Sequence, residues 1–179
     1  MRGLENLDTR NIQIMIKSIM NKVTAHDMRA TMEYLCSSFS NNVGFQLCST
    51  DYSGRCRKNL EALYINSVDL QPFVEDTLDS YERNKDNCGR KLEIIETPLC
   101  LVDPYYWKYY VIHGEKNTTY IAPNAETDGN IKDEISSLCH TNYKECSDCD
   151  VRSYCSGVWE STYSVESEKE KIMRKIKTF

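Results

Sequence analysis

The fold class is decided by the stretch Ile12-Gln13-Ile14-Met15-Ile16-Lys17-Ser18-Ile19-Met20. Isoleucine recurs at every second position from its start, and Met15 and Ile19 add apolar side chains on the opposite face. Apolar residues on both faces are typical of a strand in a parallel sheet that is covered on both sides. We therefore predict a strand over 12–20, buried on both faces, in an α/β protein.

Two more strands and two helices follow along the chain. Val43, Phe45 and Leu47 alternate with other side chains over 43–49, and Leu92-Glu93-Ile94-Ile95-Glu96 forms a third strand that Pro98 ends. Apolar residues at helical spacing predict a helix near 28–39 and a longer one that Ser67 or Asp69 caps and that ends at Cys88-Gly89. Strands that alternate with helices over short connections indicate right-handed crossovers and a parallel sheet.

The number of such units limits the architecture. A closed barrel of eight units needs about 250 residues, whereas this chain has 179. The two and a half units over roughly the first 90 residues therefore form either a small open sheet or part of a larger barrel.

Composition excludes several classes of protein. The net charge is −5 and no basic run is present, which argues against a nucleic-acid partner. The apolar-rich run over 12–20 is shorter than the roughly 18 residues of a membrane helix, so we expect no membrane contact. The first residues lack the apolar core of a secretion signal, and we expect a cytoplasmic protein.

Nine cysteines are the unusual feature of the composition. In a reducing compartment, clustered cysteines bind a metal or a cluster more often than they form disulfides. The strongest cluster is Cys146-Ser147-Asp148-Cys149-Asp150-Val151-Arg152-Ser153-Tyr154-Cys155-Ser156-Gly157, which has the spacing C-x2-C-x5-C-x-G. Outside it, Cys36 and Cys48 are interpreted as small buried apolar residues.

The charged run from Glu166 to Lys171, at the end of the chain, predicts a solvated helix.

A fourth thiolate would complete the ligand set of this motif. Cys139 lies seven positions before Cys146, and Cys100 lies at the end of the third predicted strand. Four thiolates suit a structural zinc ion and also a [4Fe–4S] cluster, and the softness of sulfur does not decide between them.

The motif and its position after the βαβαβ region resemble the C-terminal half of a radical S-adenosylmethionine enzyme with a SPASM or twitch-type auxiliary-cluster extension. The resemblance covers most of the chain. It runs through Arg2–Leu7, Ile12–Asn21, Asp51–Arg55, Thr97–Leu101 and Cys146–Gly157, with Trp159 and Tyr163 after the last segment.

The resemblance implies two domains. Residues 1–104 would form half of a TIM-like parallel barrel, equivalent to the fourth to sixth strands of the family's barrel. Residues 105–179 would form the small cysteine-rich extension that holds the auxiliary cluster, with a C-terminal helix. Ser18 and Asn21 fall near the place where the superfamily contacts the ribose of S-adenosylmethionine.

The resemblance also implies a ligand set. Cys146, Cys149 and Cys155 would bind an auxiliary [4Fe–4S] cluster, with Cys100 as the first choice for the fourth ligand and Cys139 as the second. In the complete enzyme, such a cluster engages the substrate or relays electrons during the maturation of a peptide or protein.

The chain departs from the family in one decisive respect. The defining C-x3-C-x2-C motif, whose cluster binds and cleaves the cofactor, does not occur in the sequence. We therefore expect a chain that is not catalytic alone and that binds S-adenosylmethionine only with a complementary N-terminal half. Because a half barrel exposes strand edges, we expect that half or a second copy as partner.

A second interpretation belongs to a different class of protein. The same cysteines would stabilise a non-catalytic interaction module by binding zinc. Under that interpretation the metal has a purely structural role.

Overall fold

The structure is a computed structural model that describes residues 2–10, 12–88, 91–111 and 140–167. A parallel sheet of order β1-β2-β3 forms its centre. The strands are β1 (Ile14–Met20), β2 (Val43–Ser49) and β3 (Leu92–Ile95), and they are connected through α2 (Met28–Ser38) and α5 (Ser67–Cys88). The predicted α/β class with a parallel sheet is therefore confirmed. The described strands form an open sheet and no closed barrel.

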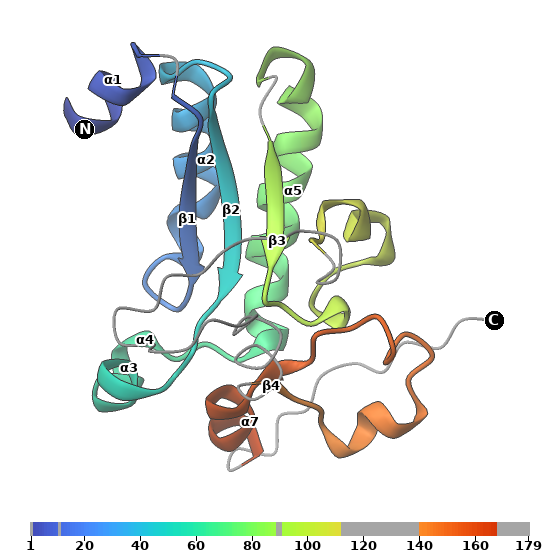
Figure 1. Cartoon of the computed structure of the whole chain (residues 1–179). Helices are drawn as coiled ribbons and strands as arrows, with labels where there is room; N and C mark the ends of the chain where they lie inside the picture. The colour runs from blue at the N-terminus through green and yellow to red at the C-terminus, as the bar shows by residue number, and fades with distance from the viewer. Residues whose placement is uncertain (1, 11, 89–90, 112–139, 168–179) are drawn as a thin grey trace, which may run out of the picture.

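Both connecting helices cover the same face of the sheet (Figure 1). Two crossovers of the same hand between neighbouring strands require this arrangement. The core lies between the two layers and is formed by Met20, Val43, Phe45, Leu47 and Ile94 from the strands, with Met28, Met32, Leu35, Val74 and Leu78 from the helices. Among the described residues, no helix is both long and apolar enough to cross a membrane.

The prediction that β1 is buried on both faces was wrong. Ile16 packs against the core, but Met15 is 38% exposed and Ile19 is 37% exposed. Single apolar residues are common on protein surfaces, so the pattern of β1 did not reveal which face is uncovered.

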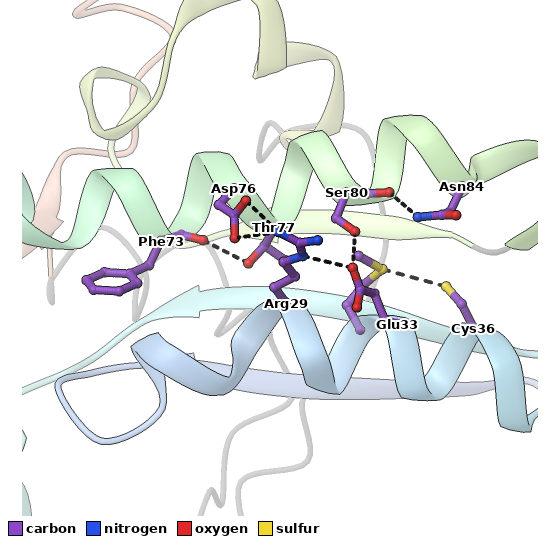
Figure 2. A network of polar contacts seen from close by, with 9 residues as sticks. Arg29, Glu33, Cys36, Phe73, Asp76, Thr77, Ser80 and Asn84 are labelled. Atoms are coloured by element: carbon purple, nitrogen blue, oxygen red, sulfur yellow. Dashed lines mark hydrogen bonds and ion pairs between the residues drawn. The ribbon is translucent and has the colours of Figure 1, made fainter.

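Polar contacts join α2 to α5 along the solvent side of their interface (Figure 2). The Arg29 guanidinium lies 2.8 Å from Glu33 Oε1 and 3.1 Å from Asp76 Oδ1, and the Ser80 hydroxyl donates to Glu33.

Cys36 lies on the same side of α2 and is disulfide-bonded, with its Sγ 3.6 Å from Met32 Sδ. The interpretation of Cys36 as a merely apolar residue was therefore wrong. Cys48, by contrast, is a buried free thiol as expected.

The remaining elements are short. They are α1 (Arg2–Asp8), η1 (Ala25–Asp27), α3 (Gly54–Lys58), α4 (Leu60–Leu63), η2 (Leu99–Leu101), η3 (Pro104–Tyr109), β4 (His140–Thr141), η4 (Lys144–Asp148), β5 (Val158–Trp159) and α7 (Glu160–Ser167). The strands β4 and β5 form a separate antiparallel pair.

The C-terminal elements lie at the carboxyl edge of the parallel sheet, near α3 and α4 (Figure 1). The Thr162 hydroxyl donates to the Thr50 carbonyl over 3.0 Å, and Ser161 donates to the Asp51 carboxylate. Since Thr50 directly follows β2, these bonds fix α7 to the end of the sheet.

Glu82 anchors η3 to α5. Its carboxylate accepts hydrogen bonds from Lys108, Lys85 and Tyr109. These bonds, with Lys108 the largest contributor, lower the pKa of Glu82 to about 2 from its ordinary 4.5. Because η3 follows η2 directly, this anchor also restrains the segment that carries Cys100.

The charge of Glu82 makes stability depend on pH. A carboxyl group whose pKa is lowered on folding stabilises the protein above its unfolded pKa, and this contribution is lost as the pH falls through the folded value. We expect Glu82→Gln to destabilise the protein at pH 7, with the deficit shrinking from about pH 4.5 downward and vanishing near pH 2. Urea unfolding at several pH values measures this. The control is Glu61→Gln on α4, which should match the wild type, and a deficit that does not change with pH would contradict the prediction.

Candidate metal centre

Three cysteines of the C-terminal motif and one from the segment after β3 line one pocket. Cys100, Cys146, Cys149 and Cys155 all contribute to this pocket between η2, η4 and the chain before β5. None of the four is in a disulfide. Cys139, the other candidate for the fourth ligand, lies outside the described residues.

Cys100 is held by the segment that follows β3. Thr97 accepts a hydrogen bond from the Ser49 hydroxyl over 3.0 Å, which ties the start of this segment to β2. Leu99 is buried, and its carbonyl accepts from the Trp107 indole over 3.0 Å. The position of Cys100 is thus set by the sheet and by η3.

Successive tight turns position the C-x2-C pair. The Cys146 amide donates to the Tyr143 carbonyl over 3.0 Å, and the Cys149 amide donates to the Cys146 carbonyl over 3.2 Å. The Arg152 amide then donates to the Cys149 carbonyl over 3.2 Å. This compact backbone brings both thiols to the same pocket despite the exposure of Ser147 and Asp148 between them.

Cys155 receives two backbone hydrogen bonds at its sulfur. The amides of Leu99 and Gly157 both lie 3.4 Å from Cys155 Sγ. Such N–H···S contacts stabilise a thiolate and tune a metal or cluster bound to it. Since Leu99 belongs to η2, the first bond also joins the segment of Cys100 to the C-terminal motif.

The four thiols influence one another electrostatically. Burial, followed by the charges of Cys155, Cys146 and Cys149, raises the pKa of Cys100 to about 12. Burial also raises the pKa of Cys146, although the Arg152 guanidinium opposes this. A bound cation would remove this mutual repulsion, because metal binding releases the protons of its thiol ligands.

The pocket does not have the spacing of a single-ion site. Within the described ranges, no three Cys, His, Asp or Glu side chains are grouped so that they could hold one metal ion.

Ser18 and Asn21 lie outside the cysteine pocket. Asn21 Oδ1 accepts from the amides of Val23 and Thr24 at 2.9 and 3.1 Å, so this side chain closes the turn after β1. Ser18 shares the helix-covered face of β1 with Ile16. Their contact with the ribose of S-adenosylmethionine stays a prediction.

Sequence reasoning missed two residues beside the pocket. Tyr143 is buried and packs, with Val158, against Cys100 and Cys146. Glu166 is 1% exposed, so the prediction that the charged run begins with a solvated side chain was wrong. Alternating charges after Glu166 concealed the burial of its side chain, and no local pattern distinguishes it from its neighbours.

Comparison with protein-family models, with curated proteins and with solved structures gives no match for this chain. The case for its function therefore rests on the pocket itself.

Gly157 offers a test of the pocket's backbone. Its φ is +76°, and a Cβ there would lie 2.5 Å from the Thr141 carbonyl oxygen. Gly54 has a similar φ of +53° with no atom within 4 Å of its Cβ position. We expect Gly54→Ala to cost about 1–2 kcal/mol of unfolding free energy, the ordinary penalty of a left-handed residue. Gly157→Ala should cost more, because the backbone must also move.

Chemical unfolding and the rate of alkylation of Cys155 measure these effects. The alkylation rate should rise in Gly157→Ala, which disturbs the amide that donates to Sγ, and stay unchanged in Gly54→Ala. Equal behaviour of the two variants would contradict the placement of Gly157 against Thr141.

Proposed function

We propose that this chain binds a [4Fe–4S] cluster through Cys100, Cys146, Cys149 and Cys155. The observation that carries the proposal is that four cysteines outside any disulfide, one of them more than forty positions from the others, line a single pocket. Burial raises the pKa of the Cys100 thiol to about 12, so this thiol is costly to ionise unless a cation offsets its charge. The donor set therefore fits a thiolate-bound inorganic centre.

The proposal prefers a cluster to zinc because the C-x2-C-x5-C-x-G motif resembles an auxiliary-cluster tail. A single zinc ion requires all four sulfurs at about 2.3 Å from one point. In a [4Fe–4S] cluster each thiolate binds a separate iron atom, so the two centres require different distances between the sulfurs.

The three-stranded sheet supports the further proposal of a half barrel of the radical S-adenosylmethionine type. Neighbouring strands follow one another in sequence, and both helices cover one face, as in a barrel of βα units. The cysteine pocket lies at the carboxyl edge, where α/β proteins bind ligands. The cluster would relay electrons or engage a peptide substrate, with S-adenosylmethionine bound only when a complementary half is present.

Iron and sulfide analysis tests the cluster. Protein purified without oxygen should be brown, with a broad absorbance shoulder near about 400 nm and equal amounts of iron and sulfide. Cys149→Ser should lose most of the iron, whereas Cys56→Ser, which alters a free thiol on α3 outside the pocket, should retain it.

The same metal analysis distinguishes the cluster from the alternative, a zinc-stabilised interaction module. Colourless protein with one zinc per chain would replace the proposal with the zinc-stabilised module. Protein with neither metal would overturn both proposals.

The exposed edge of β1 supports the proposed partner. Among the described residues β1 pairs only with β2, and Met15 and Ile19 are partly exposed beside the edge. A seven-residue strand at the edge of a sheet favours pairing with a strand of another chain. The partner would be a complementary half barrel or a second copy of this chain.

Light scattering on the purified chain tests this association. We expect a dimer or larger species, which Ile19→Lys should dissociate because a charge beside the edge opposes strand pairing. Val68→Lys places the same charge at a 55% exposed site on α5 and should leave the mass unchanged. A wild-type protein that stays monomeric over the concentration range measured would refute association with a second copy of this chain.

The proposal also places the protein in the cytoplasm, where thiolate ligands persist because thiols stay reduced. The disulfide at Cys36 is an observation against a strongly reducing compartment. None of the four cysteines of the pocket is disulfide-bonded, however.

A further inference from the structure

Glu166 is a carboxyl group in the interior of the protein. It lies near the end of α7 and is 1% exposed. A buried carboxylate is costly unless hydrogen bonds and nearby positive charge replace its water. The hydrogen-bond partners of the Glu166 carboxylate therefore indicate its role in the structure.

The first partner is the start of α5. The Ser67 amide and hydroxyl donate to Glu166 Oε1 over 3.2 and 3.0 Å. Ser67 is the first residue of a 22-residue helix, and the N-terminus of a helix carries partial positive charge. This end of the carboxylate is thus fixed to an element that packs on the sheet.

The second partner leads to the cysteine pocket. The Tyr143 hydroxyl donates to Glu166 Oε2. The Tyr143 carbonyl accepts from the Cys146 amide, and its ring packs against the side chains of Cys100 and Cys146. Tyr143 therefore connects Glu166 to two of the four thiols.

We propose that Glu166 is a positioning residue for the cysteine pocket, since through Tyr143 it holds the turn that carries Cys146 against the segment that carries Cys100. The importance of this position rests on the proposed function, because the pocket is the proposed cluster site. The link itself is a property of the chain without a cluster.

Alkylation of the reduced, metal-free full chain tests the link. Iodoacetamide is applied for increasing times, and mass spectrometry gives the rate at each cysteine. We expect Tyr143→Phe and Glu166→Gln to raise the rate at Cys146 about tenfold, which corresponds to about 1.4 kcal/mol, with Cys56 on α3 unchanged as an internal reference. Tyr143→Phe keeps the ring that contacts Tyr163, so this variant retains the fold even where Glu166→Gln does not.

Ser67→Ala is the matched control. It removes a hydrogen bond to the same carboxylate but leaves the Tyr143 contact, so it should lower the melting temperature without changing the rate at Cys146. Wild-type alkylation in Tyr143→Phe, or an equal increase in Ser67→Ala, would overturn the inference. A wild-type protein without iron would defeat the proposed function only, since the alkylation rates are measured without metal.

Discussion

The pocket depends on the short segment that leaves β3. Thr97 binds Ser49 at the end of β2, and its carbonyl lies 3.4 Å from the Ser156 hydroxyl that follows Cys155. Two residues later, the Leu99 amide donates to the sulfur of Cys155. One stretch of backbone therefore contacts the sheet and the C-terminal motif together, and Cys100 follows directly. Without it, the C-x2-C-x5-C loop would have no fixed relation to a fourth thiol.

A second set of contacts joins the C-terminal helix α7 to the end of β2 and to the start of α5. The Thr162 hydroxyl binds the backbone after β2, and Glu166 binds the first residue of α5. These contacts join residues about 100 positions apart, so the surroundings of the pocket depend on both crossovers of the sheet. Contacts between residues so far apart in sequence require the closure of long loops, which costs conformational entropy. The buried packing around Tyr143 and Val158 has to offset this cost.

Local periodicity predicted most of the layer architecture. The second strand was predicted with the bounds that the structure shows, and the long helix with the observed end at Cys88, because their apolar residues repeat at the period of the element. The motif spacing also selected Cys146, Cys149 and Cys155, whereas the choice of Cys100 over Cys139 came from the family resemblance and stays a prediction. The exposed face of β1, the disulfide at Cys36 and the burial of Glu166 depend on tertiary partners distant in sequence. No local pattern encodes those partners.

The chemistry of the pocket ties its structure to what it holds. Burial, followed by the charges of the neighbouring thiols, raises the pKa of Cys100 to about 12, so this thiol stays protonated at neutral pH, and protonated thiols bind metals poorly. If the proposed centre binds, it would displace the protons of its ligands and add positive charge to that of the Arg152 guanidinium near Cys146. Its binding energy would then add to the stability of the C-terminal elements. Because Glu166 on α7 binds the first residue of α5, that added stability would reach the parallel sheet as well.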